Sequence, residues 1–259
     1  IRDAVFITIH PIPLDRMVGV VFTDASLGNN KDLSTEVRYL ACISDSSILD
    51  GKAADTSIIA YKSHKMNRSA SNVLYTESFA MSDGLAFGEW MATWFGLCKD
   101  LNYVMKDRDV HNREIQLQSI MSTPESKLPE LLAVSDSKSL FDNSIREQFT
   151  AAEKRAALEI AVIRDSMRSL GAAARWVPHE RNCSDCLTKL KGNSASLLEL
   201  MRTGKYQLQF EEEELRRRKE ERERTGKRNP RPKRTTEDCQ PPRSRRQSSA
   251  KPKQTLYVA

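Results

Sequence analysis

Four acidic side chains, Asp24, Glu77, Asp136 and Asp185, are placed along this sequence so that they could act together on one substrate. Each stands beside an expected strand or helix end, and we expect the four to meet at one edge of a sheet. Carboxylates held together repel one another unless cations neutralise them, and their hard oxygen atoms suit Mg²⁺ or Mn²⁺ rather than Zn²⁺. Two such ions can activate an attacking water and stabilise the leaving oxygen of a phosphodiester. A single aspartate after a strand is commonly only a turn former or a helix cap, so the prediction depends on all four acids together.

The elements that would carry these acids are two apolar strands and two helices. Residues 17–23 form a β-branched apolar run that ends at Asp24, and residues 131–135 form a second run that ends at Asp136. A long helix over residues 74–99 would carry the glutamate in its first turns, and a short helix would carry the last aspartate. All four acids are therefore expected on elements that a folded core can hold rigidly.

The remaining pattern predicts further strands and helices around these elements. Strands are predicted at residues 37–43, 57–61 and 174–177, and helices at residues 137–148 and 156–170. Three successive strands followed by alternating strands and helices predict an α/β fold with a mixed sheet flanked by helices. In the long helix, Trp90, Trp94 and Phe95 are predicted to be core residues rather than base-stacking residues, because they lie in a periodic apolar helix.

Length and composition favour one globular domain with extensions. The 259 residues are 39% hydrophobic, which suits one core of roughly 150 to 200 residues. No apolar run approaches the ~20 residues needed to cross a bilayer. The five cysteines are an odd number and no secretory signal opens the chain, so we expect no structural disulfide and an intracellular location, cytoplasmic and/or nuclear.

The positive charge is concentrated near the end of the chain. Residues 211–259 carry a net charge of +7, whereas residues 1–210 carry −1. A basic segment of this kind favours a polyanionic partner, although flexible solubilising sequence is an equally good interpretation. We predict four regions: a connecting segment at 1–16, a domain at 17–191 with an insertion at about 102–128, a helical extension at 192–224, and a disordered basic tail at 225–259.

Five motifs follow one another in an order that resembles a known family. They are FTDAS (residues 22–26), YKSHK (61–65), YTESFA (75–80), VSDSKSLFDN (134–143) and WVPHERNCSDCLTKL (176–190). These segments resemble the ribonuclease H domain of copia-type long-terminal-repeat retrotransposon Pol polyproteins, over roughly residues 14–191. The last motif is the most specific, because the family carries Val-Pro and then Ala-Asp-x-Leu-Thr-Lys where this chain has Val177 and Pro178 and then residues 184–189.

The resemblance implies a fold, an activity and partners. The fold would be a ribonuclease H-like mixed five-stranded sheet, and the activity would be hydrolysis of the RNA strand of RNA/DNA hybrids. Asp24, Glu77, Asp136 and Asp185 would be the catalytic metal ligands for two Mg²⁺ ions, with Mn²⁺ possible. A reverse transcriptase would precede Ile1 in the same polyprotein, and no membrane partner is expected. The alternative is a retroelement-derived module that binds nucleic acid without cleaving it, since Tyr75 stands where many relatives have a second acid.

Discrimination of RNA from DNA requires contacts to the ribose 2′-hydroxyl, usually across the wide minor groove. The candidate substrate-binding residues are polar side chains near the acids: Ser26, Ser78, Ser137, Lys138 and His179. His179 could also protonate the leaving group or assist product release, and a surface histidine is the alternative. Phosphate contacts are weaker expectations for the exposed basic loop residues Lys62, His64, Lys65 and Arg68.

Two other interpretations of the motifs compete with this one. His179, Cys183 and Cys186 have a spacing that could supply three zinc ligands, but no convincing fourth ligand is near, so a structural zinc is the weaker interpretation. An integrase or transposase would share the fold type. Its glutamate would come last among the acids, whereas here Glu77 comes second.

Overall fold

The computed structural model describes residues 7–28, 34–70, 72–99, 131–146, 154–187 and 194–211, together with single positions 213, 216, 217, 220 and 224. The chain divides into two units, residues 1–217 and residues 218–259, and the fold below is that of the first unit. The predicted insertion at about 102–128 and most of the predicted basic tail lie outside the described residues.

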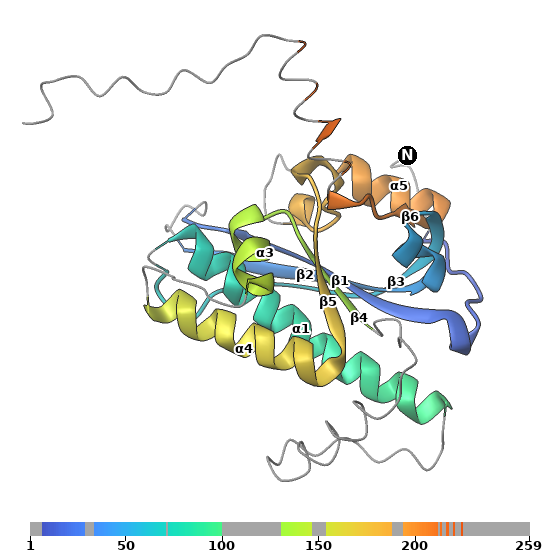
Figure 1. The fold of residues 1–259 in the computed structure, drawn as a ribbon, viewed down its shortest axis with the longest axis horizontal. Helices are drawn as coiled ribbons and strands as arrows, with labels where there is room; N and C mark the ends of the chain where they lie inside the picture. Colours follow the sequence, from blue (N-terminus) through green and yellow to red (C-terminus); the bar gives the residue numbers. More distant parts are fainter. Residues whose placement is uncertain are drawn as a thin grey trace, which may run out of the picture. The chain divides into compact units, whose positions relative to one another are not determined.

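One mixed sheet forms the centre of the first unit (Figure 1). Its strands lie in the order β5-β4-β1-β2-β3-β6. β1 pairs antiparallel with β2, and β2 pairs antiparallel with β3, whereas β4 and β5 run parallel to β1. The strands are β1 (Met17–Ser26), β2 (Glu36–Asp45), β3 (Ala53–Lys65), β4 (Leu131–Ser135), β5 (Ala172–Trp176) and β6 (Lys205–Gln207). This arrangement confirms the predicted α/β fold with a mixed sheet flanked by helices.

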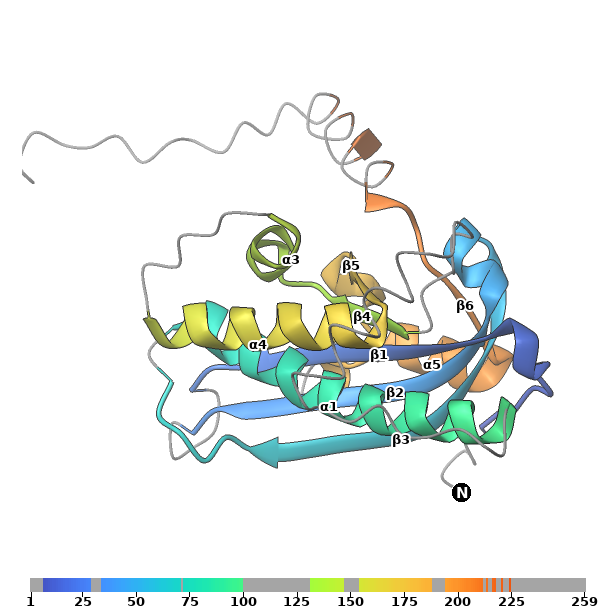
Figure 2. The same ribbon diagram turned by 60° about the horizontal axis from the view of Figure 1, so that its bottom comes forward.

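Helices cover both faces of the sheet. The α-helices are α1 (Val73–Lys99), α3 (Lys138–Ile145), α4 (Lys154–Leu170) and α5 (Ala195–Thr203), and short 3₁₀ helices include η2 (Ser46–Asp50), η3 (His179–Arg181) and η4 (Asp185–Leu187). Figure 2 shows α1 and α4 side by side along one face, with α5 near the opposite face. Within the described residues, no helix is both long enough and apolar enough to span a membrane.

Two hydrophobic clusters, one on each face, hold these layers together. On the α1 and α4 face, strand residues such as Val21 and Ala133 pack with Leu85 and Ile160. On the other face, strand side chains that include Phe22 pack with residues from α5, β6 and the segment after β6. Because β1 and β4 are buried on both faces, their sequences are continuous apolar runs, which is why both strands were predictable.

Helix α1 packs closely against the sheet at two glycines. A Cβ atom on Gly84 would lie 2.7 Å from Thr23 Cγ2, and one on Gly88 would lie 2.5 Å from Leu131 Cδ2. The absent side chains therefore let the helix backbone approach β1 and β4. The start of α1 is fixed by Asn72, whose side-chain oxygen accepts a hydrogen bond of 2.8 Å from the amide of Tyr75.

Two predictions about the elements are wrong in detail. The sheet has six strands rather than five, because β6 follows α5 inside the segment predicted as a helical extension and pairs with the start of β3. Trp90 and Trp94 are half-exposed, at 53% and 51%, rather than core residues. At 3.6 residues per turn, the step of five from buried Leu85 turns Trp90 by about 140° from the buried stripe. Phe95 does pack against the core.

Candidate active site

The register of two parallel strands places the first pair of acids side by side. The pairing of β1 with β4 ends at Thr23 and Ser135. Asp24 follows Thr23, and Asp136 follows Ser135. Strand β1 does not stop at residue 23 as predicted, because Asp24 continues its antiparallel pairing with β2. The backbone of Asp136 is held by the indole Nε1 of Trp176, which donates a 2.9 Å hydrogen bond to its carbonyl oxygen.

The third acid comes from the first turns of α1. Glu77 is buried, as is Asp24, and the side chain of Asp136 is 12% exposed. One carboxylate oxygen from each of Asp24, Glu77 and Asp136 lies within 4.8 Å of the other two. Two buried carboxylates and one partly exposed carboxylate at this spacing form the all-oxygen donor set that Mg²⁺ and Mn²⁺ prefer. The donor set therefore fits a hard divalent cation.

The fourth acid is carried by a loop that is anchored to β1. Asn182 is buried, and its Nδ2 donates a 3.0 Å hydrogen bond to the carbonyl oxygen of Thr23, directly before Asp24. Its Oδ1 accepts hydrogen bonds from the amide of Ser184, at 3.2 Å, and from the Ser184 hydroxyl, at 2.8 Å. The amide of Asp185 donates to the carbonyl oxygen of Asn182 at 3.2 Å. Asn182 thus connects the positions of the first and last aspartates.

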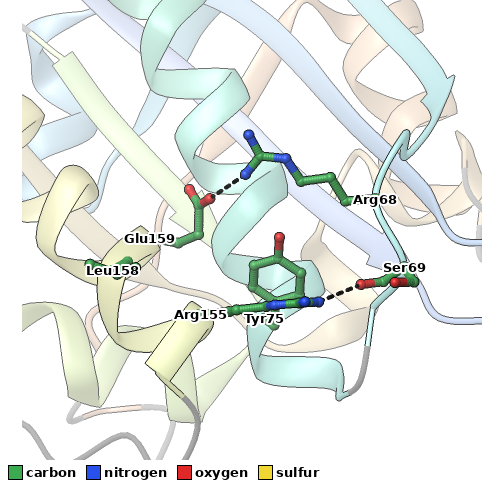
Figure 3. Close-up of a pocket in the computed structure, with 6 residues that line it drawn as sticks. All are labelled: Arg68, Ser69, Tyr75, Arg155, Leu158 and Glu159. Atoms are coloured by element: carbon green, nitrogen blue, oxygen red, sulfur yellow. Dashed lines mark hydrogen bonds and ion pairs between the residues drawn. The ribbon is translucent and has the colours of Figure 1, made fainter.

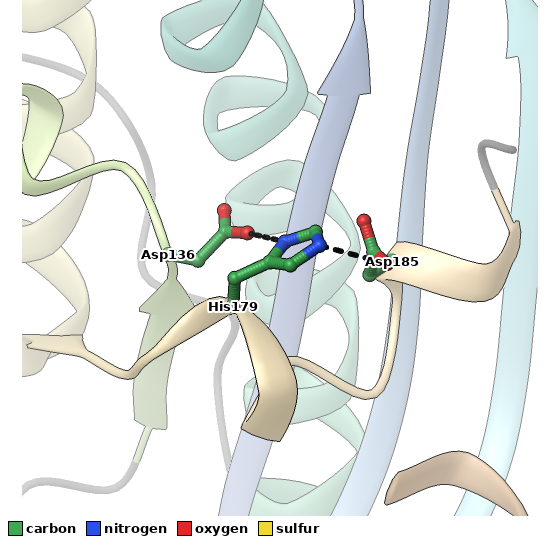
Figure 4. Close-up of side chains that lie close together, drawn as sticks. All are labelled: Asp136, His179 and Asp185. Atoms are coloured by element: carbon green, nitrogen blue, oxygen red, sulfur yellow. Dashed lines mark hydrogen bonds and ion pairs between the residues drawn. The ribbon is translucent and has the colours of Figure 1, made fainter. Parts of the chain in front are cut away.

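His179 bridges two of the acids (Figure 4). Its Nδ1 lies 3.0 Å from Oδ2 of Asp136, and its Nε2 lies 3.4 Å from Oδ2 of Asp185. The Asp185 side chain is fully buried, whereas the His179 side chain is 49% exposed. His179 therefore connects the buried acids to solvent, and one ligand atom from each of these three residues lies within 4.8 Å of the others. All four acids and His179 belong to two overlapping groups that share Asp136.

The two predicted serine contacts on β1 and α1 lie in different environments. Ser26 is the last residue of β1, and its hydroxyl is buried without a hydrogen-bond partner among the described residues. Ser78 is also buried, but its hydroxyl donates a 2.7 Å hydrogen bond to the carbonyl oxygen of Leu74. The Ser78 hydroxyl is therefore engaged by its own helix, whereas Ser26 retains an unused donor.

Ser137 and Lys138 follow Asp136 at the start of α3. Ser137 caps α3, accepting a 3.4 Å hydrogen bond from the amide of Leu140. Lys138 forms a 2.8 Å ion pair with Asp142 one turn later, and its ammonium lies 5.7 Å from the Trp176 ring centroid. The Lys138 side chain is 39% exposed, so its charge can still reach a ligand beside Asp136.

Basic residues of the β3 region divide into two groups. Lys62 pairs with Asp83 of α1 at 3.0 Å, and His64 lies 3.9 Å from the same carboxylate. Arg68 lies instead in a surface cavity of about 390 Å³ with Arg155 (Figure 3). Tyr75, two residues before Glu77, also lines it. This cavity thus brings two guanidinium groups to the end of α1 that carries the glutamate.

The contacts of Arg68 and Arg155 leave donor capacity in that cavity. Arg68 lies 3.6 Å from Glu159 of α4, and its side chain is 66% exposed. Arg155 donates a 3.4 Å hydrogen bond to the carbonyl oxygen of Ser69. A guanidinium group carries five N–H donors, so these single contacts leave others for an anionic ligand.

The cysteines near His179 do not join it in a metal-type cluster. Burial raises the pKa of Cys183 to about 12, so its thiol is protonated at neutral pH, and its Sγ lies 3.2 Å from the Ser196 hydroxyl. Burial and the charge of Asp185 also raise the pKa of Cys186. Among the described residues, the groups able to hold a metal combine His179 with aspartates and not with cysteines.

Two residues of the site were missed as site residues. Nothing local in the sequence indicates the hydrogen bond of Asn182 to Thr23, because the two residues are 159 positions apart. Arg38 lies directly across from Asp24 in the β1–β2 register and forms an ion pair with Glu36. A charged residue inside the apolar run at 37–43 was the available signal for Arg38.

Comparisons with known proteins give little beyond this geometry. No protein-family model matches the chain, and no curated protein matches it. Among solved structures, the N-terminal RNase H domain of rv2228c from Mycobacterium tuberculosis, fused to maltose binding protein, is 12% identical with a TM-score of 0.38, covering 72% of this chain and 99% of that one. RNase H1 from the halophilic archaeon Halobacterium salinarum NRC-1 is 8% identical with a TM-score of 0.37, covering 63% and 88%. Similarity at this level carries no weight for function, which has to come from the side chains of the site.

Proposed function

We propose that this chain is a metal-dependent endonuclease of ribonuclease H type that hydrolyses the RNA strand of RNA/DNA hybrids. The observation that supports this proposal is the convergence of Asp24, Glu77 and Asp136, with Asp185 connected to them through His179. Clustered carboxylates that no cation neutralises would destabilise the fold, because burial of like charges is costly. A cation-binding role gives that arrangement a physical reason.

Each group of the site has a distinct task in this proposal. Asp24, Glu77, Asp136 and Asp185 would hold two Mg²⁺ ions, or Mn²⁺. When bound, such ions activate water and stabilise the leaving oxygen of a phosphodiester. His179 is half-exposed beside two of the acids, so its imidazole can deliver a proton to the departing 3′ oxygen of the RNA. The products would carry 5′-phosphate and 3′-hydroxyl ends.

Substrate contacts would extend from the acids in two directions. Ser26 ends the strand that carries Asp24, and its buried hydroxyl would have to become accessible to donate a hydrogen bond to a ribose 2′-hydroxyl. Ser137 and Lys138 would contact the backbone of the bound hybrid beside Asp136. Arg68, together with Arg155 in the cavity of Figure 3, would bind backbone phosphate. These contacts position the hybrid, while the acids act on the scissile bond.

The five motifs also support a retroelement origin. The chain would be a piece of a copia-type Pol polyprotein, in which residues 1–16 connect it to an upstream reverse transcriptase. The basic residues after 225 would bind nucleic acid or direct nuclear import. A retroelement-derived domain that has lost turnover but binds hybrids is the second candidate function, favoured by Tyr75 in place of a second acid.

A labelled RNA/DNA hybrid incubated with Mg²⁺ tests the proposal. Asp24→Asn and Asp136→Asn should each reduce cleavage by at least about 100-fold, because metal-ion stabilisation of the transition state contributes several kcal/mol. Asp50→Asn is the matched control, since Asp50 is an exposed carboxylate that pairs with Lys52.

Three outcomes separate the candidates. Hybrid cleavage that is lost in the two site variants and kept in the control supports the nuclease. Hybrid binding by the wild-type protein without cleavage would instead identify the binding module. Equal cleavage of DNA duplex and hybrid would contradict ribonuclease H specificity and favour another nuclease of the same fold type.

A further inference from the structure

The site contains a second donor set whose chemistry differs from that of the all-carboxylate set. Asp24, Glu77 and Asp136 offer oxygen atoms only, whereas Asp136, His179 and Asp185 offer two carboxylates and one imidazole. Both sets meet the same spacing, with one atom from each residue within 4.8 Å of the others. Asp136 belongs to both sets, so occupation of one set changes the charge and ligands available to the other.

The spacing of the mixed set suits a small divalent ion. His179 Nδ1 and Asp136 Oδ2 are 3.0 Å apart, and His179 Nε2 and Asp185 Oδ2 are 3.4 Å apart (Figure 4). Ligands about 2.0 to 2.2 Å from a tetrahedral ion lie roughly 3.3 to 3.6 Å from one another. Only one ring nitrogen can ligate a given ion, so ion binding would replace at least one of the two contacts of His179 with the carboxylates.

The burial of the three side chains gives the set an open side. Asp185 is fully buried and its loop is anchored through Asn182, so this ligand is held in place. Asp136 follows β4 directly, and its backbone is fixed by Trp176. His179 is 49% exposed, which leaves a route for an ion from solvent and room for water as a further ligand. Three protein ligands with a water in the fourth position are typical of open zinc sites, as opposed to closed structural ones.

We propose that Asp136, His179 and Asp185 form a site for a borderline transition-metal ion such as Zn²⁺ or Co²⁺, separate in its metal preference from the all-carboxylate set. Imidazole favours zinc, copper and nickel over magnesium, and divalent affinity rises from Mn²⁺ towards Cu²⁺. A bound Zn²⁺ would engage Asp136, which the proposed hybrid hydrolysis also needs. Zn²⁺ is therefore an inhibitor of the cleavage reaction, and this consequence alone rests on the proposed function.

Direct titration of the full chain with Co²⁺ alone tests the site without any activity measurement. The wild-type protein should develop the visible absorption of nitrogen- and oxygen-ligated Co²⁺, and Zn²⁺ should displace it. His179→Gln should weaken Co²⁺ binding by more than about 100-fold, since loss of an outer-shell partner already costs 10- to 100-fold. Glu77→Gln, in the other donor set, should retain the absorption. Circular dichroism checks that each variant is folded.

A measurement on the wild-type protein serves if Glu77→Gln does not fold. Zn²⁺ should shift the NMR signals of the His179 imidazole and leave those of His10 and His64 in place. Co²⁺ absorption that survives His179→Gln, or unmoved His179 signals, overturns the proposed site. Hybrid cleavage that is absent in the wild type while Co²⁺ binding is present would refute the proposed function and leave the metal site standing. Cleavage that Zn²⁺ does not inhibit, despite bound Zn²⁺, would refute the shared role of Asp136.

Discussion

Removal of the Asn182 side chain should destabilise the fold and displace the loop that carries Asp185. Asn182 is 1% exposed and Ser184 is fully buried, so water cannot replace the bonds that Asn182→Ala deletes. The variant loses the 3.0 Å bond to the carbonyl oxygen of Thr23, and it leaves the amide and hydroxyl of Ser184 without their acceptor. The loop that carries Asp185 then loses the Asn182 hydrogen bond that holds it to β1, the strand that carries Asp24.

The expected loss of stability follows from the groups left unsatisfied. Each buried donor or acceptor without a partner costs about 1–3 kcal/mol. The Ser184 amide loses its acceptor and bears the full cost. The Ser184 hydroxyl can rotate and the Thr23 carbonyl has a second lone pair, so these two groups bear only part of that cost. Asn182→Ala should therefore lower the free energy of unfolding by roughly 2–5 kcal/mol. Ser184→Ala is the matched control, with an expected cost of about 1 kcal/mol, because it removes a single hydroxyl contact.

Urea denaturation and Mn²⁺ binding to the folded variants measure the two effects separately. In addition to the stability loss, Asn182→Ala should weaken Mn²⁺ binding by roughly 10- to 100-fold, as for other groups that orient metal ligands. Ser184→Ala should change Mn²⁺ affinity much less. A cost below about 1 kcal/mol for Asn182→Ala, together with unaltered Mn²⁺ affinity, would refute the anchoring role.

Three further predictions concern helix packing, acid stability and thiol reactivity. Gly84→Ala should lower the thermal unfolding midpoint, because the new Cβ would lie 2.7 Å from Thr23 Cγ2. Overpacking costs about 1–3 kcal/mol, whereas the gain in helix propensity is at most about 1 kcal/mol. Burial raises the pKa of Asp45, but its hydrogen bonds and ion pair outweigh burial and leave that pKa below its ordinary value. Its stabilisation is therefore present above pH ~4 and lost as the pH falls through the folded pKa, so Asp45→Asn should be less stable than wild type at pH 6, and the difference should shrink as the pH falls below ~4, by urea denaturation. Maleimide labelling followed by mass spectrometry should modify exposed Cys98 and spare buried Cys183, and rapid native-state labelling of Cys183 would contradict its burial and raised pKa.

The strands and helices that carry the acids were predictable because local pattern and tertiary burial agree there. β4 was predicted at residues 131–135 and is observed at Leu131–Ser135, since a strand buried on both faces reads as a continuous apolar run. β6 has three residues and gives no local signal, because its stability comes from pairing with β3 and from burial of Tyr206. Local periodicity also placed Trp90 on the buried stripe, where the true angular step puts it outside.

The four acids could be predicted from the sequence, but the distances between their carboxylates could not. Asp24, Glu77 and Asp136 were chosen as residues at strand and helix ends, and their approach depends on a parallel register and a helix held close by glycines. The bridging of Asp136 and Asp185 by His179 depends on two loops separated from β4 in sequence. No local pattern encodes such contacts, because they arise only when β4 and β5 pair.

The unequal lengths of β1 and β4 explain why a site exists at this edge of the sheet. β4 ends at Ser135, while β1 continues through Asp24 to Ser26 in antiparallel pairing with β2. Asp24 is therefore held rigidly from one side by β2 and faces the end of β4 on the other, where Asp136 leaves the sheet. Rigid backbone on one side and a terminating strand on the other allow charged side chains to converge without a further strand filling the space. The preorganisation that metal-dependent chemistry requires thus follows from the point at which one strand stops pairing.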